Sequence, residues 1–185
     1  MEQQRRAANA APLGLLGFGM TTVLLNLHNA GITKLSIVIA AMGFALGGAA
    51  QIIAGIMEFK NRNTFGATAF TAYGFFWWSL IVIWLNPGQM LAAADLTSMG
   101  FYLLLWAVFT AGMFACSLRH NNITKIVFGS LTLLFLLLAV ADFSNFAPIT
   151  TIAGAVGIFC GLSAIYSALG QIIGEEYGKK VFPLL

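Results

Sequence analysis

Long apolar runs separated by short polar segments divide the chain into six parts. A helix that spans a bilayer needs about 20 mainly apolar residues, and charged positions interrupt this chain at about that interval. The pattern predicts six membrane-spanning helices, over residues 13–30, 35–57, 64–85, 98–118, 123–141 and 149–173. We therefore predict an all-α membrane protein in which residues 1–185 form one domain, a single six-helix bundle.

The composition supports this class of protein and excludes others. Hydrophobic residues make up 59% of the chain and charged residues only 8%, whereas about a quarter of the residues of a soluble domain are charged. The formal net charge of +3 is not gathered into one patch, so no nucleic-acid partner is expected. Cys116 and Cys160 lie in separate apolar runs without a CxxC pattern, and we interpret them as packing residues. We expect no metal and no cofactor.

The distribution of lysine and arginine predicts the orientation, because these residues are retained on the cytoplasmic side of a span. Of the nine cations, only Lys34 falls in a loop on the opposite side. The other cations lie at the chain ends and in the even-numbered loops: Arg5, Arg6, Lys60, Arg62, Arg119, Lys125, Lys179 and Lys180. We predict that both termini are cytoplasmic and that the protein is a multi-pass protein of the cell inner (plasma) membrane.

Three of the predicted spans carry a small, mildly polar face. At 100° per residue, the residues that share a face are Phe18, Thr22, Leu25 and Asn29 on the first span, with Thr21 and Asn26 at its edges; Gly47, Gln51, Ala54, Gly55 and Glu58 on the second; and Gly157, Cys160, Ala164, Ser167 and Gln171 on the sixth. Polar side chains at bilayer depth usually face protein or water. Each face is either a contact between helices or part of the wall of a narrow passage.

Small residues and hydroxyls point to further helix contacts. Gly43 with Gly47, and Gly157 with Gly161, are i, i+4 pairs that let helix backbones approach closely, either within the bundle or between subunits. The third span repeats hydroxyls at Thr64, Thr68, Thr71 and Ser79. This stripe is a second candidate lining for a passage.

The sequence contains no pattern typical of an enzyme: HExxH, G-x-S-x-G, paired intramembrane aspartates and glycine-rich phosphate loops are all absent. His28 and Glu58 lie near opposite membrane surfaces, and no chain of ionisable residues connects them. His28 is either an interfacial hydrogen-bonding residue or a switch. Glu58 is either a regulatory residue or a partner of Lys60 or Arg62 in a loop ion pair.

Three segments resemble the acetate uptake transporter family. They are residues 9–22 (NAAPLGLLGFGMTT), 54–77 (AGIMEFKNRNTFGATAFTAYGFFW) and 161–166 (GLSAIY), and the resemblance extends over nearly the whole chain in the same order. The N-terminal family motif N-P-x-P is represented by Asn9, Pro12, Leu13 and Gly14, with Ala10 in place of the first proline. A second departure is NRN at residues 61–63, where the family usually has a glycine before NTFG.

The resemblance implies a homohexamer whose protomers each carry their own path for small monocarboxylates or dicarboxylates. It also implies a hydrophobic constriction at Phe18, Tyr73 and Leu131, and a role for Ala164 in selecting substrate size. Tyr73 lies about 180° around the helix from Thr64, so the tyrosine and the threonine stripe cannot both face one narrow path. We assign Tyr73 to the path and the threonines to contacts with another helix or subunit.

These observations predict membrane transport of acetate, with succinate or other small carboxylates as further substrates, by a channel-like or proton-assisted mechanism. Hydrogen-bond donors must replace the water that an anion loses in such a path. We expect them from Thr21, Asn26, Gln51, Asn63 and the Tyr73 hydroxyl. The predicted substrate path comprises Thr21, Thr22, Asn26, Gln51, Asn63, Ala164 and Ser167. The alternatives are a membrane carboxylate sensor or assembly protein that does not transport, and a pore for ammonia or water.

Overall fold

The computed structural model describes residues 8–87 and 91–183, and its regular elements are all helices. They are α1 (Ala11–Asn29), α2 (Ile37–Met42), η1 (Gly43–Ala50), α3 (Gln51–Lys60), α4 (Thr64–Leu85), α5 (Leu96–Ser117), α6 (Asn122–Ser144) and α7 (Ala147–Tyr177). Because α2, η1 and α3 follow one another without a break, the described chain contains six helices that are long and apolar enough to cross a membrane. Arg5 and Arg6, used above for the orientation, lie outside the described residues.

The helices extend beyond some of the predicted spans. The second spanning helix ends at Lys60 where the pattern predicted residue 57, and α7 ends at Tyr177 where it predicted residue 173. Apolar runs mark only the part of a helix that lies in lipid, whereas the helix itself can continue into the polar surroundings. The exposed Glu175 and Glu176 belong to such an extension of α7.

Polar caps explain why several helices begin where they do. An N-cap side chain accepts a hydrogen bond from a backbone N–H group of the first turn, and this is seen for Asn63 at α4, Asp95 at α5 and Asn121 at α6. Hydrogen bonds from Ser98 hold the pKa of the Asp95 carboxyl below its usual value. In contrast, α1 and α7 begin with a proline in the first turn, whose fixed φ suits that position.

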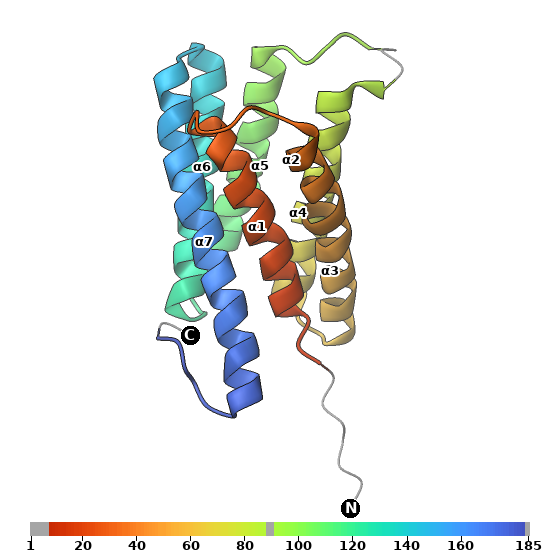
Figure 1. Ribbon diagram of the computed structural model, residues 1–185, viewed down its shortest axis with the longest axis vertical. Coiled ribbons are helices and arrows are strands. Elements are labelled where there is room, and N and C mark those ends of the chain that lie inside the picture. Colours follow the sequence, from red (N-terminus) through yellow and green to blue (C-terminus); the bar gives the residue numbers. More distant parts are fainter. Residues whose placement is uncertain (1–7, 88–90, 184–185) are drawn as a thin grey trace, which may run out of the picture.

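The helices stand side by side as one bundle, and α1 begins at the same end at which α7 finishes (Figure 1). Figure 1 also shows α1 between α7 on one side and the continuous α2–η1–α3 helix on the other. The main packing pairs are α1 with α7, α6 with α7, α5 with α6, and α3 with α4. This arrangement brings α1, α4 and α6, which are distant in sequence, around a common centre.

Both predicted glycine pairs serve packing within the protomer. A Cβ atom added at Gly161 would lie 2.7 Å from the backbone oxygen of Gly19, so α1 and α7 touch through their backbones. On the second spanning helix, a Cβ atom at Gly43 or Gly47 would lie 2.9 or 2.7 Å from the ring of Trp77. The glycines therefore let Trp77, itself 2% exposed, lie flat against the helix and bring α4 close to it.

A π-helix, η1, interrupts the second spanning helix, and the sequence pattern did not predict it. Such segments are rare, and they redirect backbone groups, frequently at functional sites. In η1 the carbonyl oxygen of Phe44 accepts a hydrogen bond from the indole of Trp78 at 3.1 Å. The carbonyl oxygen of Gly47 accepts one from Gln51 Nε2 at 2.7 Å. The π-helix thus supplies backbone acceptors to two side chains.

We predict that Gly161→Ala weakens the contact between α1 and α7. The added methyl group meets a backbone oxygen, which cannot move aside as a flexible side chain could, and overpacking of this kind costs about 1–3 kcal/mol. The variant should show a lower apparent melting temperature than the wild type in thermal unfolding of the detergent-solubilised protein.

Gly112→Ala in α5 is the matched control, because a Cβ atom there has no neighbour within 4 Å. Alanine is favoured over glycine in a helix by about 1 kcal/mol, so this variant should melt at or above the wild-type temperature. A Gly161→Ala variant as stable as Gly112→Ala would contradict the proposed packing.

Candidate functional site

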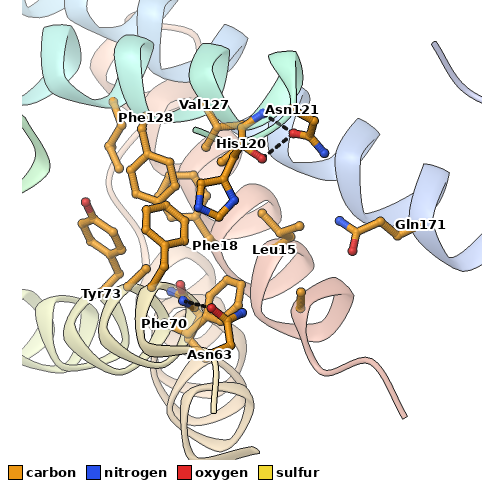
Figure 2. A pocket seen from close by; sticks show the side chains of 17 residues that line it. Leu15, Phe18, Asn63, Phe70, Tyr73, His120, Asn121, Val127, Phe128 and Gln171 are labelled. Carbon is orange, nitrogen blue, oxygen red and sulfur yellow. Dashed lines mark hydrogen bonds between the residues drawn. The ribbon is translucent and has the colours of Figure 1, made fainter. Parts of the chain in front are cut away.

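Among the described residues, two neighbouring cavities are lined by side chains of α1, α4 and α6. The wider cavity has a volume of about 210 Å³, and its lining includes Ala11 at the start of α1 and Asn63 and Asn121 at the N-caps of α4 and α6. Figure 2 shows His120 and Asn121 on one side of it, Asn63 and Phe70 on another, and Leu15 and Gln171 on a third. The polar residues that line it are Gln51, Asn63, His120, Asn121, Thr124 and Gln171.

The second cavity is much smaller and more apolar. Its volume is about 30 Å³, and it lies among the C-terminal half of α1, the middle of α4 and α6. Thr22 and Asn26 are the polar residues of its lining, and the remaining residues are mostly leucines and aromatic side chains. It therefore continues the line of the wider cavity toward the opposite end of the bundle.

The two cavities share three lining residues: Phe18 of α1, Tyr73 of α4 and Leu131 of α6. All three are buried, with exposed fractions of 7%, 3% and 2%. The rings of Phe18 and Tyr73 lie with their centroids 6.0 Å apart and their planes inclined by 47°. Two aromatic rings and one aliphatic side chain thus separate the cavities, and these are the residues assigned to a constriction from the family resemblance.

Tyr73 is held from the side facing away from the cavities. Its hydroxyl lies 2.9 Å from Thr110 Oγ1 on α5, and Thr110 in turn donates its own hydrogen to the Trp106 carbonyl oxygen at 2.7 Å. Because Thr110 has only one hydroxyl hydrogen, the phenol of Tyr73 is the donor in this pair. The Tyr73 hydroxyl hydrogen is therefore not available for donation to a solute, contrary to the expectation from the sequence.

The structure brings four of the predicted path residues to the cavities. Gln51 and Asn63 line the wider cavity, and Thr22 and Asn26 line the smaller one. Each amide already has a protein partner: Gln51 Nε2 donates to the Gly47 carbonyl oxygen at 2.7 Å, Asn26 Nδ2 to that of Thr22 at 2.9 Å, and Asn63 Nδ2 to Glu58 Oε2 at 2.7 Å.

The other three predicted path residues do not line either cavity. The Thr21 hydroxyl donates to the carbonyl oxygen of Gly17 at 2.6 Å, so its hydrogen is used within its own helix. Ala164 is fully buried in the core. Ser167 is buried and accepts a hydrogen bond from Gln171 Nε2 at 3.3 Å. Their contribution to a path is at most indirect, through the helices that they hold in place.

The threonine stripe of α4 does not line the cavities either. A Cβ atom added at Gly55 of α3 would collide with Thr71 Oγ1 and lie 2.8 Å from the backbone nitrogen of the same residue. Thr71 therefore packs directly on α3, as the assignment of the threonines to helix contacts predicts. Thr64, at the start of α4, is exposed.

Glu58 and His28 have local partners at opposite ends of the bundle. Glu58 is 3% exposed, and its Oε2 accepts the hydrogen bond from Asn63, the N-cap of α4. The loop ion pair with Lys60 or Arg62 stays a prediction. His28 Nδ1 lies 3.1 Å from the carbonyl oxygen of Thr33, which agrees with an interfacial hydrogen-bonding role.

The N-terminal motif contacts two residues that line the wider cavity, Gln171 and Phe70. Asn9 Nδ2 donates to Gln171 Oε1 of α7 at 3.0 Å, and Asn9 Oδ1 accepts from the backbone of Ala11 at 3.1 Å. Pro12 lies in the first turn of α1 and is buried. A Cβ atom at Gly14 would lie 2.5 Å from the Phe70 ring, so Gly14 lets this ring pack against α1. Leu13, 42% exposed, faces away from the bundle.

Sequence reasoning did not assign His120, Asn121, Thr124 and Phe65 to the site. His120 and Asn121 belong to the short connection between α5 and α6, and the ring of His120 stacks on Phe65 with centroids 4.4 Å apart. In the sequence these residues resemble an ordinary polar loop next to Arg119. Among the described residues, no group of three or more His, Cys, Asp or Glu side chains could hold a metal ion.

Comparisons with known proteins agree with this arrangement. Residues 1–182 match the profile of the GPR1/FUN34/yaaH family. The succinate-acetate/proton symporter SatP of Escherichia coli (strain K12) is 50% identical over 180 residues, which are 97% of this chain and 96% of SatP. Ammonia transport outward protein 2 of Saccharomyces cerevisiae is 39% identical over 178 residues, which are 91% of this chain and 63% of the yeast protein.

A solved structure of the bacterial acetate channel SatP has the same fold. It aligns with a TM-score of 0.95 at 49% sequence identity, over 97% of this chain and 100% of that one. The family resemblance that the sequence motifs indicated is thereby confirmed. With its six apolar helices, this multi-pass membrane protein belongs to the GPR1/FUN34/yaaH family.

Proposed function

We propose that this protein carries acetate across a membrane, with succinate and other small carboxylates as further substrates, along a path inside each protomer. The observation that carries the proposal is the pair of cavities that meet at Phe18, Tyr73 and Leu131. Two similar proteins support the substrate, since one is described as a succinate-acetate/proton symporter and the other as an acetate channel. Neither description fits a sensor or an assembly protein.

The chemistry of the cavities suits rapid passage of a weakly bound solute. Among the described residues, the lining of both cavities contains no lysine, arginine, aspartate or glutamate. Amides and hydroxyls of the wider cavity can exchange places with the water around a carboxyl group. At the three apolar side chains this water must be shed, which makes the constriction the step that selects by size and polarity.

We further propose the orientation and the assembly of the protein. The cations Lys60, Arg62, Arg119 and Lys125 lie at or beside the helix ends where α1 begins. By the preference of such cations for the cytoplasm, both termini and the mouth of the wider cavity face the cytoplasm, and the membrane is the inner (plasma) membrane. Residues 1–185 act as one domain, and six copies form a homohexamer. The family resemblance supports the hexamer.

Purified protein in liposomes should increase the uptake of labelled acetate above that of protein-free liposomes. The control without protein is necessary because undissociated acetic acid crosses lipid unaided. Excess unlabelled succinate should lower the protein-dependent uptake if dicarboxylates share the path. An absence of protein-dependent uptake at every pH tested would refute the proposed transport, and saturable acetate binding in the same vesicles would then favour a sensor.

Leu131→Ala should widen the constriction and relax its size selection. Because one methylene group in an apolar pocket changes selectivity by about tenfold, we expect the flux of propionate relative to acetate to rise by about tenfold. Leu133→Ala is the matched control on the same helix, since Leu133 is 48% exposed and faces away from both cavities. Equal propionate-to-acetate ratios in the two variants would exclude Leu131 from the constriction.

The hexamer has a separate test. Light scattering of the detergent-solubilised protein, corrected for bound detergent, should give six times the mass of one chain. A mass of one or two chains under conditions that retain transport would contradict the proposed assembly, while leaving a path within each protomer intact.

A further inference from the structure

Helix α5 lines neither cavity, yet it holds a residue of the proposed constriction. Within the described part of the chain, none of residues 96–117 belongs to the lining of either cavity. The main packing partner of α5 is α6. Hydrogen bonds between side chains link α5 to α4, between Tyr102 and Ser79 at 2.7 Å and between Thr110 and Tyr73 at 2.9 Å. The second link fixes a side chain that separates the two cavities.

The hydrogen bond between these two residues matters more to Tyr73 than to Thr110. The Thr110 hydroxyl donates to the Trp106 carbonyl oxygen at 2.7 Å, so it keeps a partner even without Tyr73. Tyr73 is 3% exposed, and Thr110 Oγ1 is the acceptor that the structure gives to its hydroxyl. A buried donor that loses its acceptor is costly. The position of the phenol therefore depends on Thr110.

Aromatic rings of α5 pack against the same phenol. The centroid of the Tyr73 ring lies 5.9 Å from that of Trp106 and 5.5 Å from that of Phe109. On α1, the Phe18 ring lies 6.0 Å away. These rings give the phenol its apolar contacts but supply no oxygen to accept its hydrogen. Among these neighbours, Thr110 is the one that can hold the hydroxyl in a fixed direction.

Building on the proposed transport of acetate, we propose that Thr110 is a positioning residue for the constriction: its oxygen holds the Tyr73 hydroxyl against α5 and so keeps the phenol out of the passage. Without this acceptor, the hydroxyl gains polar surroundings by turning toward the wider cavity, whose lining contains amides and hydroxyls. A phenol turned in this way narrows the gap to Phe18 and Leu131. Helix α5 thus sets the width of a passage that it does not line.

The first test removes the acceptor and keeps the shape of the side chain, with Thr110→Val. Because a buried donor without a partner costs a factor of about ten or more, protein-dependent uptake of labelled acetate into liposomes should fall about tenfold. Uptake of propionate, the larger acid, should fall further. Thr110→Ser retains the hydroxyl, and its uptake should stay within about twofold of the wild type. Wild-type uptake by Thr110→Val would overturn the proposal.

Thr132→Val on α6 is the matched control. The Thr132 hydroxyl donates to the Phe128 carbonyl oxygen at 2.8 Å, within its own helix, just as Thr110 donates to Trp106. Thr132 lines neither cavity. The control therefore loses the same kind of bond within a helix, and it should keep wild-type uptake. A fall as large as that of Thr110→Val would assign the effect to the helix and contradict the positioning role.

The second test is a double-mutant cycle with Tyr73→Phe, which separates positioning from packing. Phenylalanine has no hydroxyl and needs no acceptor. Thr110→Val should therefore lower acetate uptake about tenfold when Tyr73 is present, but by less than about twofold when it is added to Tyr73→Phe. An equal loss in both backgrounds would assign Thr110 to packing and overturn the proposal. If thermal unfolding in detergent shows that Thr110→Val is not folded, Thr110→Ala, which removes the same acceptor without adding volume, takes its place in the cycle.

The outcomes separate this inference from the function on which it rests. Wild-type proteoliposomes that show no protein-dependent acetate uptake would refute the proposed transport itself. Wild-type uptake without coupling between Thr110 and Tyr73 in the cycle would refute the positioning role while leaving acetate transport in place. Uptake together with this coupling would support both.

Discussion

Inside a membrane bundle, polar groups find their hydrogen-bond partners in the protein or in a water-filled cavity, because the surrounding lipid offers none. This constraint determines how the central side chains of this protein are arranged. Tyr73 donates to Thr110, Asn26 to Thr22 and Gln51 to Gly47, each over a short distance. The polar groups are thereby turned toward the helices, and mainly apolar surfaces remain where the two cavities meet. The proposed constriction at Phe18, Tyr73 and Leu131 follows from this pairing.

Close helix packing brings together the three residues of the proposed constriction, Phe18, Tyr73 and Leu131. Gly19 and Gly161 bring α1 against α7, and Trp77 lies flat on Gly43 and Gly47 of the second spanning helix. These glycine contacts hold α1 and α4 close together. The rings of Phe18 and Tyr73 can therefore touch. The π-helix η1 then changes the register of the second spanning helix. Its Gly47 carbonyl oxygen orients the Gln51 amide. Backbone geometry in one helix thus fixes the orientation of a side chain in the wall of the wider cavity.

The sequence predicted the six helices because hydropathy and charge depend on the bilayer alone, and the family resemblance supplied the residues that the cavities share. It did not predict the direction of hydrogen bonds. Gln51 was expected to donate to a solute, but the π-helix carbonyl that accepts one of its two N–H groups has no signature in the sequence pattern. His120 was missed because a polar loop residue and a cavity residue have the same sequence context, and only the packing of α5 and α6 against α4 distinguishes them.

The central claim is that solute passes within each protomer between Phe18, Tyr73 and Leu131. A covalent plug tests it most directly. Leu131→Cys, in a background with Cys116 and Cys160 replaced by alanine, should lose acetate flux after reaction with a small methanethiosulfonate reagent. Leu133→Cys in the same background, labelled to the same extent, should keep it. Full acetate flux through a Leu131→Cys protein whose labelling is complete by mass spectrometry would contradict the account.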